Sequence, residues 1–193
     1  MITKSNRNTK EKIKLGDIAR ILSGVYAKGN PTGEIACLQI KDLQMASPET
    51  TAIRIEYAPK IDNYMLKKGD LLFAGKGTTY LCKVFNLDIP AVPSTTLYSI
   101  RLHSSIVSPE YLCWYLNHPS VVASIKTVQA GTGTPLIHKP TLENLDIIIP
   151  DHVTQQMIVE LSSLQKREKE ILEAIAEKRM QITNQILINE LNK

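Results

Sequence analysis

The sequence has few of the features that indicate a disulfide-bonded, secreted or membrane-spanning protein. Only three of its 193 residues are cysteines, and Cys37, Cys82 and Cys113 are scattered along the chain. An odd number of scattered cysteines indicates neither a disulfide framework nor a zinc knuckle. We therefore expect each cysteine to be a small, buried apolar side chain. No apolar run approaches the roughly 20 residues that span a bilayer, and residues 1–14 are polar, without a signal-peptide core. We therefore expect a cytoplasmic protein.

The sequence also lacks the patterns that usually carry catalysis. Its four histidines, His103, His118, His138 and His152, have no cysteine or carboxylate at metal-ligand spacing. There is no Gly-x-Ser-x-Gly elbow, no dinucleotide-binding glycine triplet after a strand, and no Pro-Pro pair such as an amino-methyltransferase motif would contain. We expect no catalytic residue, no metal and no cofactor in this chain.

The basic excess of the chain is unevenly distributed. The net charge is +4, and 43% hydrophobic with 22% charged residues predicts a folded protein. Through Pro150 there are 17 Lys or Arg against 12 Asp or Glu, whereas the remainder has 6 against 7. Many soluble proteins without polyanionic partners carry a similar net charge. The distribution of charge is more informative than the net charge, because the excess of basic residues lies entirely in residues 1–150.

The chain changes character at Pro150, after which it contains neither proline nor glycine. This predicts two domains, residues 1–150 and residues 151–193, the second being one long helix with Asp151 as its N-cap. Apolar residues recur there at helical spacing, at Met157, Leu161, Leu164, Ile171 or Leu172, Ile175, Ile182 and Ile186. Because Leu164, Ile175 and Ile186 are eleven residues apart, we expect little supercoiling.

A helix of about 40 residues would be roughly 60 Å long, more than one small domain can cover. It could fold back over its own domain, or it could pair with a second copy or with a different protein. Pairing is favoured, because water would otherwise reach four apolar residues of the C-terminal half, Ile182, Ile186, Leu187 and Leu191. We expect the helix to pair as a coiled coil through Leu161, Leu164, Ile171, Ile175, Ile182 and Ile186.

The first part predicts an α+β domain, in which prolines and glycines separate short elements. A short helix is expected over residues 14–22, after a basic N-terminal arm. Ser108, Pro109 and Glu110 supply an N-cap, an N1 proline and a first-turn acid for a helix over residues 110–117, and Pro119 starts another. Strands are expected at residues 34–40, 53–57, 70–73, 80–87, 96–102 and 145–149, with turns at Asn30-Pro31, Lys68-Gly69 and Ala91-Pro93.

The stretch GDLLFAGKGTTY has glycines, a lysine and threonines in an order that suggests a phosphate-binding loop. The spacing is wrong, because one residue too many separates Gly69 from Gly75-Lys76, and Gly77 occupies the hydroxyl position. A strand pattern follows, although a phosphate site would need the start of a helix. The sequence therefore does not predict a nucleotide site.

Two loops of one style are the candidate binding segments, GKGTTY at residues 75–80 and AGTGTPLIHKP at residues 130–140. Glycines let a backbone approach a ligand closely, lysine neutralises phosphate, and threonine and tyrosine can contact base edges. The alternative is two ordinary exposed turns. The predicted DNA-binding residues are Lys76, Thr78, Thr79, Tyr80, Gly131, Thr132, Thr134, His138 and Lys139.

Four motifs in order carry a resemblance to a known family: IKLGDIARILSG, LKKGDLLFAGKGT, SPEYLCWYLN, and GTGTPLIHKPTLENLDIIIPDHVTQQMIVELSSL. The chain resembles one repeat of the specificity subunit of type I restriction-modification systems, from about Lys14 onward. The last motif is the most specific, through Leu142, Leu145, Ile147, Ile149, Pro150, Gln155, Gln156 and Ile158.

The resemblance implies a target recognition domain that reads a short half-site in double-stranded DNA, followed by a long helix, without catalytic activity. Separate modification subunits would methylate adenine and a restriction subunit would cleave. The family subunit carries two recognition domains and two long helices, whereas this sequence has one of each. Two copies paired antiparallel would restore the pattern, so we expect a homodimer that reads a bipartite palindrome.

The sequence leaves three alternatives open. The chain could be a natural half-subunit or a piece of a two-domain subunit. It could target another phage-defence or methyltransferase assembly. It could also be a helical scaffold that does not read DNA.

Overall fold

The computed structural model describes residues 11–75, 80–128 and 137–192. The chain divides between Gln155 and Gln156 into two compact units. The first unit mixes strands and short helices, and the second is a single helix. The predicted α+β class with a long C-terminal helix is confirmed.

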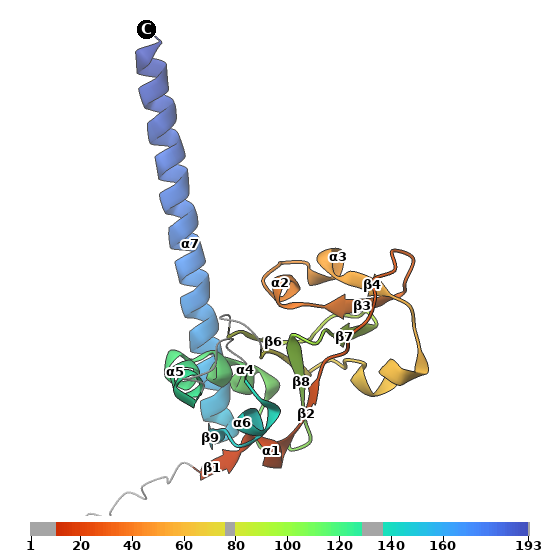
Figure 1. Ribbon diagram of the computed structural model, residues 1–193. Helices are drawn as coiled ribbons and strands as arrows, with labels where there is room; N and C mark the ends of the chain where they lie inside the picture. Colours follow the sequence, from red (N-terminus) through yellow and green to blue (C-terminus); the bar gives the residue numbers. More distant parts are fainter. Residues whose placement is uncertain (1–10, 76–79, 129–136, 193) are drawn as a thin grey trace, which may run out of the picture. The chain divides into compact units, whose positions relative to one another are not determined.

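The first unit is built around a four-stranded antiparallel sheet (Figure 1). Its order is β2 (Ala19–Ser23), β8 (Leu97–Leu102), β5 (Leu71–Ala74) and β6 (Cys82–Val84). All four residues of β5 are buried, so this strand reads as a continuous apolar run and not as an alternating one. Because β5 is buried on both faces, it holds in place the turn that precedes Leu71 and the residue that follows Ala74, Gly75.

A second sheet places β3 (Ile35–Leu38) between β4 (Ile53–Ile55) and β7 (Ala91–Pro93). β4 is antiparallel and β7 parallel to β3. The short helices α2 (Ile40–Leu43) and α3 (Pro48–Thr51) lie beside this sheet (Figure 1), and a 3-10 helix, η1 (Pro59–Tyr64), packs on β7.

A two-stranded pair joins segments that are far apart in the sequence. β1 (Glu11–Lys14) is antiparallel to β9 (Asp146–Ile149). The Lys14 ammonium lies 2.6 Å from an Asp146 carboxylate oxygen, and this hydrogen bond lowers the pKa of Asp146. The neighbouring helices are α1 (Leu15–Ile18) and α6 (Lys139–Glu143), which pack on each other. The strand that leads to Pro150 is therefore tied to the first described residues.

The predicted capped helices are confirmed. In α4 (Pro109–Asn117) the Ser108 hydroxyl accepts a hydrogen bond from the Tyr111 backbone N–H at 3.1 Å. Helix α5 (Pro119–Val128) follows at once. The Tyr111 hydroxyl donates to the Ile148 carbonyl at 2.7 Å, and burial raises the pKa of Tyr111 to about 12. This side chain therefore fastens α4 to β9.

The long helix α7 (His152–Leu191) begins as predicted. The Asp151 carboxylate accepts a hydrogen bond from the Thr154 backbone N–H at 2.9 Å, which lowers the pKa of Asp151. Gln155, in the first turn, is the one buried residue of α7. No helix among the described residues is long and apolar enough to cross a membrane.

Two local predictions were wrong. The expected helix over residues 14–22 stops at Ile18, because Ala19–Ser23 form β2 and pair with β8. Ala91–Pro93 form a buried parallel strand and not a turn. In both places long-range pairing overrides the local pattern. The turn at Lys68-Gly69 is confirmed, with Gly69 at a φ of 87°. Residues 1–10 of the expected arm lie outside the described residues.

Candidate nucleic-acid interface

The described ends of the two candidate loops meet. The Ile137 backbone N–H donates to the Gly75 carbonyl at 2.9 Å, which joins the segment after β5 to the segment before α6. The Tyr98 hydroxyl, from β8, donates to the Ile137 carbonyl at 2.8 Å. Both polar groups of the Ile137 backbone are therefore satisfied by the central sheet and its loop. Segments that are about 60 residues apart in the sequence form one region.

Gly75 permits this junction because a side chain would not fit there. A Cβ atom at position 75 would lie 2.2 Å from Cε2 of the Tyr98 ring, well inside van der Waals contact. Burial raises the pKa of Tyr98, and a hydrogen bond with Ser23 partly opposes that effect. The glycine that suggested a phosphate loop is thus explained by packing against a buried tyrosine.

Tyr98→Phe should lower the free energy of unfolding by about 1 kcal/mol, because the Ile137 carbonyl loses a buried donor. Urea unfolding followed by circular dichroism would measure the loss. Tyr26→Phe is the matched control, since Tyr26 is 85% exposed. Equal stability of the two variants would contradict the proposed role of the Tyr98 hydroxyl.

The structure describes three of the nine predicted DNA-binding residues. The Tyr80 ring is half-buried, His138 is exposed as the residue before α6, and Lys139 forms an ion pair with Glu143 at 3.4 Å. The others lie outside the described residues: Lys76, Thr78, Thr79, Gly131, Thr132 and Thr134. The DNA-binding role of all nine stays a prediction.

Lys126 is a basic residue that the sequence patterns did not single out. It lies in the last turn of α5, and its ammonium is 5.1 Å from the centre of the Tyr80 ring. This distance allows a cation–π contact, which leaves the ammonium hydrogens able to reach an anion. Its position in the helix just before the second candidate loop could have marked it as a candidate. Its contact with Tyr80, however, could not be predicted from the sequence, because it depends on the fold. Lys126 therefore joins Tyr80 and Lys139 as a candidate DNA-contact residue.

Asp70, in the Gly-Asp motif, serves the fold and not a ligand. Its carboxylate accepts hydrogen bonds from the Arg101 guanidinium at 2.7 and 2.6 Å and from the Lys67 backbone N–H at 2.8 Å. Arg101 also donates to the Met65 carbonyl. The Asp70 hydrogen bond raises the pKa of Arg101. The buried carboxylate fixes the turn that leads to β5, and its oxygens are occupied by protein donors.

Two cysteines also serve packing. The Cys113 thiol, in α4, donates to the Cys82 carbonyl at 3.3 Å, and the Asn117 amide donates to the same carbonyl at 2.8 Å. Burial raises the pKa of the Cys82 thiol well above its usual value. Cys37 and Cys82 are buried as predicted, whereas Cys113 is only partly buried.

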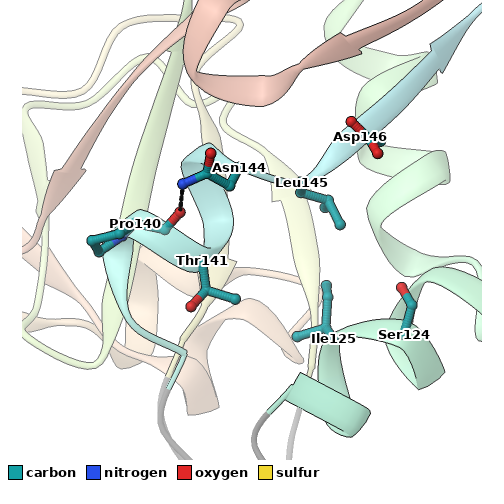
Figure 2. Close-up of a pocket in the computed structure, with 7 residues that line it drawn as sticks. All are labelled: Ser124, Ile125, Pro140, Thr141, Asn144, Leu145 and Asp146. Carbon is teal, nitrogen blue, oxygen red and sulfur yellow. Dashed lines mark hydrogen bonds between the residues drawn. The ribbon is translucent and has the colours of Figure 1, made fainter.

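A pocket of about 570 Å³ lies among α5, α6 and β9 (Figure 2). Ile125 and Leu145 contribute its apolar wall, and the Asn144 side chain turns back to the Pro140 carbonyl at 2.8 Å. Asp146, at its edge, is paired with Lys14. Within the described residues no group of three His, Cys, Asp or Glu could hold a metal ion. The pocket shows no arrangement of nucleophile and base.

The predicted pairing residues all lie on α7 and are exposed. The exposed fractions run from 44% at Ile175 to 59% at Ile182. A single helix cannot bury its own side chains, so this unit has no hydrophobic core. The six residues are Leu161, Leu164, Ile171, Ile175, Ile182 and Ile186. Their part in pairing stays a prediction.

The two units have the fold of solved type I specificity subunits. The HsdS subunit from Thermoanaerobacter tengcongensis matches with a TM-score of 0.60 and 16% identity, over 86% of this chain and 40% of that one. A chain from a study of complex assembly and conformational transition in a type I restriction-modification system matches with a TM-score of 0.64 and 19% identity, over 91% and 43%. At these identities the likeness shows the fold alone.

The family model for the type I restriction modification DNA specificity domain matches residues 7–192, and the chain belongs to that family. The resemblance carried by the four motifs is thereby confirmed. The chain is 26% identical over 203 residues to the type I restriction enzyme MjaVIII specificity subunit of Methanocaldococcus jannaschii, covering 94% of this chain and 47% of that protein. It spans about half the length of this curated relative.

Proposed function

We infer that this chain is the sequence-specific DNA recognition subunit of a type I restriction-modification system. The family match over residues 7–192 carries the inference, because it includes both units. Separate methyltransferase and restriction subunits would supply the chemistry at the site that this chain selects. The basic excess before Pro150 and the junction of the two loops support DNA contact by the first unit.

The chain itself is proposed to be non-catalytic. The described residues offer no metal cluster and no paired nucleophile and base, and the carboxylate of the Gly-Asp motif is occupied by Arg101. Incubation of the purified chain with S-adenosylmethionine and DNA should give no methyl transfer above a heat-denatured sample. Methyl transfer by the chain alone would contradict this assignment.

A dimer of this chain would contain two recognition domains, as a full-length subunit does. The chain spans 47% of its curated relative, and it has one recognition unit and one long helix. In an antiparallel pair of helices, a twofold axis places the two N-terminal units at opposite ends. The proposed homodimer then reads an inverted repeat with a fixed central gap, because the helix length sets the distance between the half-sites.

Selection from a random duplex library at physiological salt tests the proposed reading of DNA. The purified chain should retain two inverted half-sites at one fixed spacing. A single enriched half-site would support DNA reading without the dimer. No enrichment over shuffled sequences would contradict independent recognition by this chain.

Charge reversal should weaken DNA binding through the two loops. For Lys76→Glu and Lys139→Glu, the slope of log affinity against log salt should fall by about 1 for each phosphate that the variant no longer neutralises. Fluorescence anisotropy at several salt concentrations measures the slope. Lys60→Glu makes the same charge change in η1 and is the control. An unchanged slope in both loop variants would reject the loops as phosphate-binding segments.

A further inference from the structure

The exposed apolar stripe of α7 contains two charged residues near its middle. At about 100° of rotation per residue, nine side chains between Met157 and Ile186 fall within an arc of about 80°. They are Met157, Leu161, Leu164, Glu168, Leu172, Ile175, Arg179, Ile182 and Ile186. Glu168 and Arg179 thus lie among the residues that would face a partner helix, with apolar neighbours on either side.

The order of these nine side chains, called the α7 stripe, is symmetric under antiparallel pairing from Leu161 to Ile186. If a second copy pairs about a point between Glu173 and Ala174, Leu172 of one copy lies opposite Ile175 of the other. Leu161 then lies opposite Ile186, and Leu164 lies within one residue of Ile182. In the same register Glu168 of each copy lies opposite Arg179 of the other. Each dimer would therefore contain two Glu168–Arg179 contacts between opposite charges.

The point of symmetry is also the middle of the helical unit. The unit begins at Gln156 and its helix ends at Leu191, so a point between Glu173 and Ala174 is equidistant from both ends. A second copy in this register overlaps the whole helix, over about 53 Å at 1.5 Å per residue. The register that matches the charges is thus also the register that leaves no overhang.

Other arrangements of two copies bring charges into unfavourable places. Parallel pairing in register sets Glu168 against Glu168 and Arg179 against Arg179, and like charges at such positions select against a pairing. An antiparallel slip of one turn sets Glu168 near Ile175 and Arg179 near Leu164. Each charge would then lose its partner while facing an apolar side chain.

Both side chains are available for contacts between copies. Among the ion pairs of the described residues, those on α7 join Lys166 to Glu170 at 3.8 Å and Lys169 to Glu173 at 3.7 Å, and neither includes Glu168 or Arg179. These four charged residues lie off the stripe and pair along their own helix. Glu168 and Arg179 belong to neither pair.

We propose that Glu168 and Arg179 form the ion pair that fixes the register and the antiparallel direction of a dimer of this chain through the α7 stripe. This inference rests on the self-association proposed above and specifies which partner the helix selects. The second copy is favoured over a different protein because Glu168 and Arg179 lie opposite each other and the apolar residues of the stripe from Leu161 to Ile186 meet apolar residues to within one position. Met157 is the one residue of the stripe outside this match, because Glu190 lies opposite it.

Charge exchange on the full-length chain tests the pair. Glu168→Arg places two arginines opposite each other, and Arg179→Glu places two glutamates opposite each other. Each single variant should raise the dimer dissociation constant on the order of 100-fold, since two like-charge contacts form in each dimer. Sedimentation equilibrium measures this. The double variant Glu168→Arg with Arg179→Glu should dimerise like the unsubstituted chain, because antiparallel pairing restores both contacts.

Native mass spectrometry of mixtures separates antiparallel from parallel pairing. The double variant mixed with the unsubstituted chain should give the two homodimers and no heterodimer, whereas parallel pairing would favour the heterodimer. The control exchanges Lys166→Glu with Glu170→Arg, which reverses an existing ion pair on the opposite face of the helix, and should leave dimerisation unchanged.

The outcomes distinguish this inference from the proposed function. A dimeric chain that is unaffected by the single variants would overturn the ion pair and leave the dimer standing. Weakening in the single variants without recovery in the double variant would overturn the antiparallel register. A monomer at tens of micromolar would overturn the dimer together with its register, while the DNA selection experiment would still test recognition.

Discussion

Replacement of Asp70 by Asn should lower the free energy of unfolding by about 3 kcal/mol, the cost of breaking a buried ion pair by removing one partner. The Asp70 side chain is 3% exposed, and it accepts hydrogen bonds from Arg101 and from the Lys67 backbone. Asparagine keeps the shape but loses the charge, and its amide nitrogen would face donors. We place the loss at the low end for such pairs because Arg101 is 37% exposed and water can reach it.

Urea unfolding at neutral pH measures this loss, and the structure offers a close control. Lys68 and Asp88 form an ion pair of the same length, 2.6 Å, with side chains that are 59% and 83% exposed. Asp88→Asn should therefore change stability by less than about 1 kcal/mol. If Asp70→Asn were as mild as Asp88→Asn, the Gly-Asp motif would not be a structural clamp, and a ligand role for Asp70 would return.

The fold could be predicted wherever local pattern and long-range pairing agree. Apolar runs bounded by turn residues located β5 and β8, and Ser108 with Pro109 located the start of α4. Asp151 located the start of α7 in the same way. The pattern failed at Ala19–Ser23 and Ala91–Pro93, because pairing with β8 and β3 decides their conformation. Neither partner is adjacent in the sequence.

The candidate site was predictable as two segments but not as one region. Glycines, threonines and lysines marked both loops, yet nothing local links Gly75 to Ile137, whose backbone hydrogen bond joins them. The role of Gly75 could not be foreseen either, because it depends on the Tyr98 ring from a neighbouring strand. Lys126 was missed because its contact with Tyr80, 46 residues away in the sequence, arises only when the chain folds.

The Gln-Gln pair of the last family motif splits into two roles. Gln155 is 1% exposed and belongs to the first unit, whereas Gln156 is exposed and begins the second. The side-chain oxygen of Gln155, Oε1, accepts a hydrogen bond from the Ser108 backbone N–H at 2.9 Å. Its amide nitrogen donates to the carbonyls of Ile106 and Pro150 at 2.7 and 2.9 Å. One side chain thus joins the start of α4 to the first turn of α7.

Gln155→Ala should lower the free energy of unfolding by about 3 kcal/mol, because one backbone donor and two carbonyls lose a partner that water cannot easily replace. Gln156→Ala, the neighbouring substitution, should cost less than about 0.5 kcal/mol. Urea unfolding of the two variants gives the comparison directly. Equal and small losses would show that the buried amide is not a structural link between α4 and α7.

Gln155→Glu gives a sharper test, because its effect should depend on pH. A glutamate there keeps an acceptor for the Ser108 N–H, but when ionised it faces the Ile106 and Pro150 carbonyls without a proton to donate. Burial and the two carbonyls should raise its folded-state pKa above the unfolded value, since both disfavour the charged form. The destabilisation should then be largest at neutral pH and diminish as the pH falls through the folded-state pKa, where the acid regains a donor. A loss that is the same at pH 5 and pH 8 would contradict the hydrogen-bond account, because a purely steric effect of the substitution does not titrate.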